Sequence, residues 1–352
     1  MNQGNIATLL QAIPLASVLV GRGERILGAN DRAVALLGPG LTGRHFITAI
    51  RQPTVLDAVE ASLRDRETRQ TRYLSSAGAQ DTTFIVTCSP VETEAGSGVL
   101  LCFEDVTHLE QVGQMRRDFV ANVSHELRTP LTALLGFIET LRGPARNDPV
   151  ATERFLGTMQ VEASRMERLV KDLLSLSRVE AQERVRPTDR VDLIRLINAV
   201  IHATRPIAEE ADVTIAFRTE VQEIHVPGDA DQLHQILTNL IENAVKYGGP
   251  GKTVTVTLEA HSDHPALRGP SAVVSVADQG PGIEEVHIPR LTERFYRIDS
   301  HRSREMGGTG LGLAIVKHIV NRHRGRLKVE SELGQGTRFD VILPSRPASP
   351  QA

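Results

Sequence analysis

The segment "FVANVSHELRTPLTALLGF" at 119–137 combines a histidine, an acid and a threonine with a helical pattern of leucines. His125 and Thr129 are four residues apart, so on a helix they share a face. A neutral imidazole has a nitrogen able to attack phosphorus, and Glu126 can accept the proton of the other ring nitrogen. Pro130 should bend the helix nearby. The pattern favours a nucleophilic histidine, although a lone histidine on a helix is far more often a packing or surface residue.

A second group of polar residues lies in "NLIENAVKYGG". Asn239, Asn243 and Lys246 follow helical i, i+4, i+7 spacing and therefore share one face. An amide oxygen such as that of Asn243 suits Mg²⁺, and Lys246 offers a point charge to phosphate. The alternative is a solvated helix face, which is equally compatible with this segment taken alone.

In "VVSVADQGPGI", Asp278 ends an apolar run and is followed by Gly280 and Gly282. A carboxylate only accepts hydrogen bonds, so at the floor of a pocket it suits the amino group of adenine and disfavours the carbonyl of guanine. The alternative is an aspartate that caps a turn whose glycines adopt positive φ.

Glycines also precede the apolar helix of "GGTGLGLAIVKHIV", at positions 307, 308, 310 and 312. Glycine allows backbone N–H groups to approach an anion, and a helix N-terminus adds its dipole, so this segment favours phosphate over a plain loop. The basic segment "RFYRIDSHRSREMGG" just before it predicts a lid that supplies Arg294, Arg297, Arg302 or Arg304 to phosphates.

Three folded regions must position these groups. Residues 6–107 alternate short strand-like and helical runs, which predicts an α+β domain. Two long amphipathic helices, at about 106–142 and 150–182, predict an αα-hairpin whose apolar faces need a second copy to complete a four-helix bundle. After Pro187, helices and strands alternate again and predict a second α+β domain. The segment 178–189 is expected to act as a hinge.

Bulk properties exclude several classes of function. The net charge is −3 and there is no tryptophan, so direct nucleic-acid binding is not expected. Cys88 and Cys102 lie in apolar runs and predict a buried pair of reduced thiols. No apolar run is long enough for a membrane span. We therefore expect a cytoplasmic protein, or the cytoplasmic part of a longer membrane protein.

Together these motifs resemble those of the sensor histidine kinases of two-component systems. The polar helix, the aspartate turn, the lid and the glycine loop resemble their N, G1, F and G2 boxes, within the wider group of gyrase-, Hsp90- and MutL-type ATPases. "SHELRTPLT" resembles their H box, whereas "NDRAVALLG" and "FEDVTHLEQ" are similar to a PAS sensor domain. "MRRDFVANVSHELRTPLTALLGFIETL" is most similar to the phosphate-regulon sensors of this family.

This resemblance implies a multidomain α+β protein with four regions. These are a PAS-like α/β sensor domain at 1–107, a linker helix and dimeric phosphoacceptor hairpin at 108–186, a gyrase/Hsp90-type α/β-sandwich ATP-binding domain at 187–345, and a disordered tail at 346–352. The implied partners are a second copy of the chain, through the four-helix bundle, and a response regulator, of the phosphate-response type by analogy.

The resemblance also implies roles for single residues. His125 would accept phosphate from ATP and pass it to an aspartate of the regulator, with Glu126 as its acid–base partner. Thr129 would position the water that dephosphorylates the regulator. Asn243 would ligate Mg²⁺, and Asp278 would bind adenine. The remaining nucleotide-binding residues implied are Asn239, Lys246, Tyr247, Gly280, Gly282, Arg294, Gly308, Thr309, Gly310, Leu311 and Gly312.

Two other functions stay open on the sequence alone. One is an ATPase clamp, but Asn239 stands where hydrolysing relatives carry a glutamate, and an amide is a poor base for water. The other is a degenerate kinase that only dimerises and binds a regulator, against which the complete set of nucleotide motifs argues. For the PAS-like region, a docking and dimerisation role without a ligand is at least as compatible as a sensor pocket.

Overall fold

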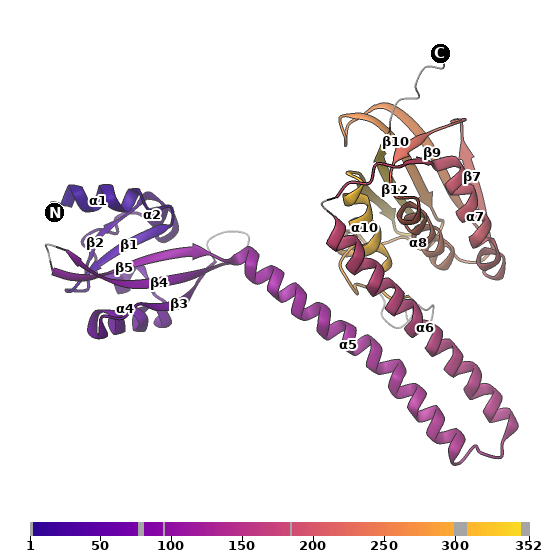
Figure 1. Ribbon diagram of the computed structural model, residues 1–352, viewed down its shortest axis with the longest axis horizontal. Helices are drawn as coiled ribbons and strands as arrows, with labels where there is room; N and C mark the ends of the chain where they lie inside the picture. The colour runs from indigo at the N-terminus through magenta and orange to yellow at the C-terminus, as the bar shows by residue number, and fades with distance from the viewer. Residues whose placement is uncertain (1–2, 77–80, 94–95, 184, 299–307, 346–352) are drawn as a thin grey trace. The chain divides into compact units, whose positions relative to one another are not determined.

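The computed structural model describes residues 3–76, 81–93, 96–183, 185–298 and 308–345. The chain divides into two compact units, Met1–Ala121 and Asn122–Ala352 (Figure 1). Within the described ranges, no helix is both long enough and apolar enough to cross a membrane. Four parts of the sequence predictions, namely Arg302, Arg304, Gly307 and the tail at 346–352, lie outside the described residues.

The first unit is built on a five-stranded antiparallel sheet with the strand order β2-β1-β5-β4-β3. Its elements are α1 (Gln3–Gln11), β1 (Ala16–Gly21), β2 (Ile26–Ala29), α2 (Asp31–Leu37), α3 (Phe46–Ala49), α4 (Pro53–Asp65), β3 (Arg69–Ser75), β4 (Thr82–Thr93) and β5 (Gly96–Asp105). The strand-like runs at 16–21, 25–30, 82–91 and 97–106 and the helical runs at 30–38 and 53–65 are all present as strands and helices. The sequence did not predict α1, the short helix α3 or the edge strand β3, in which polar side chains predominate.

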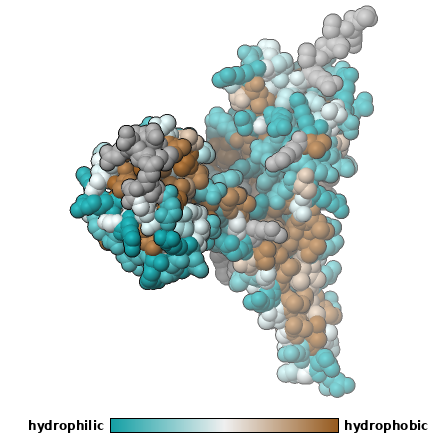
Figure 2. Space-filling model, turned by 60° about the vertical axis from the view of Figure 1, so that its left-hand side comes forward, coloured by the Kyte–Doolittle hydropathy of each residue, from teal (hydrophilic) through white to brown (hydrophobic). Residues whose placement is uncertain are grey.

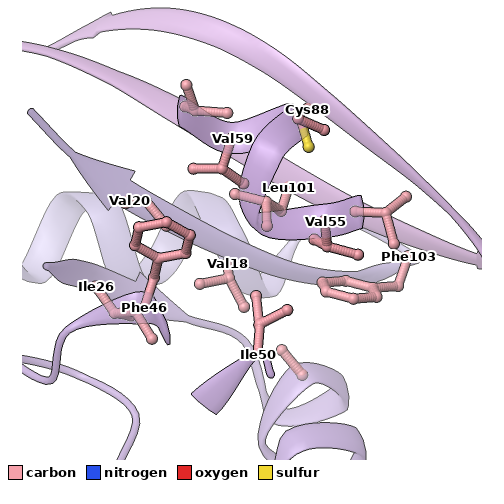
Figure 3. Close-up of a cluster of buried hydrophobic side chains, with 14 of the residues drawn as sticks. Val18, Val20, Ile26, Phe46, Ile50, Val55, Val59, Cys88, Leu101 and Phe103 are labelled. Carbon is pink, nitrogen blue, oxygen red and sulfur yellow. The ribbon is translucent and has the colours of Figure 1, made fainter. Parts of the chain in front are cut away.

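Alternation along β1 gives the sheet two apolar faces. Val18 and Val20 are fully buried on the inner face, among the side chains that α2, α3 and α4 contribute to the main core (Figure 3). Leu19, between them, points to the other face and packs with Ile6 and Leu10 of α1. Successive residues of a strand point to opposite faces, so α1 covers part of the second face.

The side chain of Asn30 ties three segments of this unit together. Its Oδ1 accepts hydrogen bonds from the backbone N–H groups of Ser17 and Ala33, the second of which caps α2. Its Nδ2 donates to the carbonyl oxygens of Leu10, Ile13 and Leu15, next to α1. Asn30 is therefore the N-cap of α2, and its amide also satisfies the buried turn after α1.

The two cysteines are both free thiols. Cys88 is fully buried in the inner core, and burial raises the pKa of its thiol to about 12. Cys102 points to the outer face, where its Sγ lies 3.5 Å from the hydroxyl of Ser17, and it is only half-buried. The expected reduced thiols are confirmed, but the expected burial holds for Cys88 alone.

The end of the sheet is joined to the long helix α5 (Thr107–Arg142) by side-chain bonds. Asp105 Oδ1 accepts hydrogen bonds from both the N–H and the hydroxyl of Thr107. These bonds lower the pKa of the Asp105 carboxyl, and they outweigh the opposing effect of burial. The Thr107 hydroxyl oxygen also accepts from the N–H of Thr83 in β4. Arg72 of β3 forms an ion pair with Glu110 of α5 at 2.9 Å. The first turn of α5 is therefore attached to the edge of the sheet.

The second unit begins with the rest of α5 and the antiparallel helix α6 (Pro149–Gln182), which form the predicted hairpin. Asp148 caps α6 by accepting from the N–H groups of Val150 and Ala151, and Pro149 occupies the first helical position. Between the helices, the rings of Phe137 and Phe155 lie 5.4 Å apart. α6 ends at Gln182, inside the segment expected to be a hinge.

The hairpin leaves many large apolar side chains exposed. Figure 2 shows hydrophobic residues gathered along its length. The exposed members in the second unit are Leu131, Leu135, Ile138, Val150, Leu156, Val161, Val170 and Leu174. A soluble protein rarely leaves so much apolar surface uncovered, so this face indicates an interaction site.

The remainder of the second unit is a two-layer α/β domain. Its five-stranded sheet has the order β11-β12-β10-β9-β7, in which only the β7–β9 pair is parallel. The elements are β6 (Arg190–Asp192), α7 (Leu193–Glu210), β7 (Val213–Thr219), β8 (His225–Pro227), α8 (Ala230–Gly248), β9 (Lys252–His264), β10 (Gly269–Ala277), a 3₁₀-helix η1 (Glu285–Arg290), α10 (Gly312–Arg322), β11 (Arg326–Glu332) and β12 (Gly336–Pro344). Helices α7, α8 and α10 pack on one another and on the sheet (Figure 1).

Candidate functional site

The predicted phosphoacceptor lies on the surface of α5. His125 is exposed, and the hydroxyl of Thr129 donates to its backbone carbonyl at 3.2 Å. Pro130 is buried within the continuous helix. Glu126 is only 14 % exposed, and its carboxylate pairs with Arg165 of α6 at 3.2 Å and with Arg297 at 3.4 Å. The histidine can therefore be approached from solvent, while its acidic neighbour is held in place by two guanidinium groups.

Helix α8 presents its predicted polar face as expected from the spacing. Asn239, Asn243 and Lys246 are each half-buried, whereas the leucines of the opposite face are buried. The amide of Asn239 lies 3.4 Å from the carbonyl of Gly312. Lys246 lies 3.8 Å from the carboxylate of Glu242, one turn earlier. A solvated face would leave these side chains exposed, so their half-burial favours a pocket wall.

Asp278 follows β10 and is held by backbone groups from two directions. Its Oδ1 accepts from the N–H of Gly280 at 2.8 Å and from the N–H of Thr337 at 3.3 Å. Burial raises the pKa of this carboxyl, and the two N–H bonds act in the opposite direction. Within the described residues, Oδ2 has no hydrogen-bond donor, so it remains able to accept one from a ligand such as the adenine amino group.

Two of the predicted glycines are required by close backbone approach. A Cβ on Gly280 would lie 2.3 Å from the carbonyl oxygen of Tyr247, at the end of α8. Gly282 has φ +73° and lies against the backbone of Glu332, 2.1 Å from where its Cβ would be. These contacts place the turn after Asp278 between the end of α8 and the end of β11. Tyr247 itself is 42 % exposed beside this turn.

The glycine loop leads into α10. Gly310 has φ +73°, its carbonyl accepts from the N–H of Phe295, and a Cβ there would lie 2.9 Å from the Phe295 Cα. The hydroxyl of Thr309 lies 3.3 Å from the N–H of Leu311, which is buried and precedes α10. The loop therefore lies against the first part of the predicted lid and turns its backbone toward the start of a helix, as anion binding requires.

Comparison with known proteins identifies both regions of the second unit. Residues 115–182 match the His Kinase A (phospho-acceptor) domain, and residues 228–347 match the histidine kinase-, DNA gyrase B- and HSP90-like ATPase family. Over 333 residues the chain is 33 % identical to a Sensor protein kinase WalK of Staphylococcus aureus, covering 93 % of this chain and 77 % of that protein. The chain belongs to the sensor histidine kinases.

Other relatives are similar over different parts of the kinase. The WalK of Staphylococcus saprophyticus is 34 % identical over 339 residues, which is 93 % of this chain. The phosphate regulon sensor protein PhoR of Pseudomonas aeruginosa is 39 % identical over 240 residues, or 68 % of this chain. The chain spans about half the length of these two relatives, 53 % and 52 %. The predicted special closeness to phosphate-regulon sensors is therefore not confirmed.

One solved structure shares the fold over almost the whole of this chain. It is that of histidine kinase ThkA in complex with response regulator protein TrrA, with a TM-score of 0.53 at 23 % identity, covering 97 % of this chain and 98 % of that one. The likeness supports the arrangement of elements described above.

The described residues include the two ends of the predicted lid. Arg294 lies 2.6 Å from Glu180 near the end of α6, and Arg297, only 8 % exposed, donates to the carbonyl of Gly308. Arg297 is the same residue that pairs with Glu126. Of the four arginines predicted to reach phosphates, these two lie beside the glycine loop or the hairpin.

The residues fit a nucleotide with Mg²⁺. Mg²⁺ is usually held by one or two protein oxygens together with substrate phosphates, and Asn243 offers such an oxygen beside Lys246. In the part of the chain that is described, no three His, Cys, Asp or Glu side chains form a metal cluster.

Three residues of the site were missed by the sequence reasoning. Thr337 of β12 binds Asp278 through its N–H, Arg165 of α6 pairs with Glu126, and Asp172 of α6 accepts from the hydroxyl of Thr309 at 2.6 Å. Each is far along the chain from its partner, so local spacing carried no signal. The only available signal for Thr337 was its place in "GQGTRF", beside two glycines.

Proposed function

We propose that this kinase transfers the γ-phosphoryl group of ATP to His125 and then to an aspartate of a response regulator. In the first step an imidazole nitrogen of His125 forms a bond to phosphorus, the bond to the bridging oxygen breaks, and ADP leaves. Glu126 accepts the proton of the other ring nitrogen. The observation that supports the proposal is that one unit contains an exposed histidine, a carboxylate paired with two arginines, and the half-buried polar face of α8 next to Asp278.

The nucleotide-binding roles follow from chemistry and placement. Asp278 accepts from the adenine amino group, Asn243 ligates Mg²⁺, and Lys246 and Arg294 bind phosphate oxygens. ATP and Mg²⁺ supply the transferable group and neutralise its charge. The other residues that we assign to the nucleotide pocket are Asn239, Tyr247, Gly280, Gly282, Gly308, Thr309, Gly310, Leu311 and Gly312. Phosphoryl transfer depends mostly on positioning and charge neutralisation, which these groups provide.

We further propose that Thr129 positions a water that removes the phosphoryl group from the regulator, so the kinase also acts as a phosphatase. The hydroxyl of Thr129 is on the same exposed face as His125, one helical turn away, which supports this role. The exposed apolar face of the hairpin supports a homodimer through a four-helix bundle. Replacing the exposed Leu135 by a charged residue is expected to disrupt this homodimer and to give monomers in analytical ultracentrifugation.

The domain boundaries 1–107, 108–186 and 187–345 and a PAS-like role for the first belong to the same proposal. The five-stranded antiparallel sheet and its attachment to α5 support a sensor that acts on the hairpin. A cytoplasmic location suits the ATP requirement. A phosphate-responsive pathway is supported by the PhoR relative, while the WalK relatives match more of the chain. Phosphotransfer assays with regulators of both kinds decide between these pathways.

The deciding experiment is incubation of the purified chain with Mg²⁺ and γ-labelled ATP, beside a His125→Ala variant. An acid-labile, alkali-stable label on the wild type alone supports the proposal. A label of equal size on the variant places the phosphoryl group on another residue and refutes the role of His125. Measuring nucleotide binding in both proteins checks that the variant keeps its ATP site.

A further inference from the structure

Three groups of the glycine loop and the predicted lid, all of types that bind phosphate, are each bonded to an acidic side chain of the hairpin. Thr309 donates its hydroxyl to Asp172 at 2.6 Å, Arg294 pairs with Glu180, and Arg297 pairs with Glu126. Hydroxyl and guanidinium groups form the same kinds of bonds with phosphate oxygens as they form here with carboxylates. The hairpin therefore places carboxylates where the glycine loop and the lid would otherwise face phosphates.

Asp172 is half-buried where α6 meets the glycine loop. Its carboxylate accepts a hydrogen bond from Thr309 and interacts electrostatically with Glu242 and Lys246 of α8. Burial raises the pKa of this carboxyl, while the Thr309 bond and the cations Lys246 and Arg168 oppose the rise. A half-buried carboxylate beside a second acid is unfavourable unless a specific bond offsets it, and the hydrogen bond from Thr309 provides that offset.

The flanking residues of α6 explain how Asp172 reaches the glycine loop. Leu169, Leu176 and Val179 are almost fully buried, and the last turns of α6 pack against α10. Arg322 of α10 completes the contact by donating to the carbonyl oxygens of Gln182 and Val185. One face of α6 is thus seated on the ATP-binding domain, and Asp172 lies on it between two buried apolar positions.

We propose that Asp172 is a positioning residue that acts as an internal substitute for phosphate. It holds Thr309 and the glycine loop against the hairpin, and a bound polyphosphate must displace it. This inference rests on the proposed function, because it assigns Thr309 and Lys246 to the nucleotide. Two anions cannot share the same donors, so ATP binding and docking of α6 oppose each other. By linkage, docking weakens ATP binding by the same factor by which ATP weakens docking.

The consequence is a device that keeps the ATP domain seated on the hairpin until a polyphosphate arrives. Adenine recognition at Asp278 does not involve this contact, so a ligand without phosphates does not compete with Asp172. A nucleoside and a nucleoside triphosphate should therefore respond differently to its removal.

The test is titration calorimetry of the full chain with a non-hydrolysable ATP analogue and Mg²⁺, and with adenosine. Asp172→Asn removes the negative charge at constant size, and we expect it to bind the analogue about five-fold more tightly or better. Adenosine affinity should not change. Asp172→Glu keeps the charge and should keep the weaker binding. Glu167→Gln is the matched control on the same helix, since Glu167 is exposed and, within the described residues, forms an ion pair with Lys171 only.

Autophosphorylation kinetics supply a second readout. Asp172→Asn should lower the KM for ATP, which a merely structural role of Asp172 would not do. Unchanged or weaker binding of the analogue by Asp172→Asn overturns the inference while leaving the kinase proposal intact. An equal gain for adenosine also overturns it, because the effect would then not depend on phosphates. If the wild type binds neither ligand, the proposed function fails together with this inference.

Discussion

Replacing Asp278 by asparagine should shift the nucleotide preference of this kinase from ATP toward inosine triphosphate, for a reason that follows from the hydrogen bonds of Asp278. Oδ1 of Asp278 accepts from the N–H groups of Gly280 and Thr337. An asparagine must keep its oxygen toward these two donors, because its NH₂ group would meet them donor to donor. The NH₂ group then faces the ligand, where an adenine amino group would also donate.

The expected loss follows from the cost of an unmatched bond. A hydrogen bond to a charged group contributes about 1.5–3 kcal/mol, so Asp278→Asn should bind ATP about 10- to 150-fold more weakly. Inosine triphosphate carries a carbonyl in place of the amino group. That carbonyl repels the carboxylate of the wild type but accepts from the asparagine NH₂. The ratio of ATP to inosine triphosphate affinity should therefore fall in the variant by more than the ATP loss alone.

Titration calorimetry with both nucleotides and Mg²⁺ measures this ratio. Asp278→Ala is the control, since it should lose ATP affinity without gaining affinity for inosine triphosphate. Thermal unfolding of both variants checks that the turn at Gly280 is intact. If Asp278→Asn keeps the wild-type preference for ATP, Asp278 does not read the amino group of adenine and the assigned orientation of the base is wrong.

Three further changes test other parts of the molecule. Thr129→Ala should leave autophosphorylation near the wild-type rate but slow dephosphorylation of the regulator about 10²-fold, as a positioned water is lost; loss of autophosphorylation would contradict this division of roles. His323 is fully buried, burial lowers its pKa, and its Nε2 accepts from the N–H of Asp229. Because the folded state disfavours the charged form, stability is present above the unfolded pKa and is lost as pH falls below about 6.5, by at most about 1.4 kcal/mol per pH unit. Thermal melts of His323→Gln should lack this component. Asn30→Ala removes the five hydrogen bonds of that side chain and should lower the free energy of unfolding of the first unit by about 2–4 kcal/mol in urea titrations, whereas no change would show that water replaces them.

Local pattern was enough to predict most of the elements. The helix at 53–65 and the hairpin helices were recovered nearly to the residue, because apolar spacing, prolines at the first helical position and capping side chains are local signals. Strand β3 was missed because its sequence, "RQTRYLS", alternates polar and half-buried residues at the edge of the sheet. Strand β7 pairs in parallel with β9 across α8, and nothing near it in the sequence marks that partner.

In the candidate site, too, local features were predictable from the sequence and contacts between distant segments were not. The face shared by Asn239, Asn243 and Lys246 was predictable because all three lie on one helix. The second bond to Asp278 was not, since its donor, Thr337, comes from β12, 59 residues later. Pairing of antiparallel strands β10 and β12 brings the two together, and that register is set by the buried strand faces rather than by either residue.

The contacts between α6 and the ATP-binding domain are the part of the site that was least predictable from the sequence. The segment 178–189, which ends the second helix of the hairpin, was predicted to be a hinge that leaves the ATP-binding domain mobile. In the structure, Glu180 pairs with Arg294 and with His318, and the buried Leu176 and Val179 precede it on the same helix. A segment can be a hinge in one state and a docking surface in another. Glu180 of this segment pairs with Arg294, which we assign to phosphate, so docking of the segment should depend on nucleotide in the same way as the contact of Asp172.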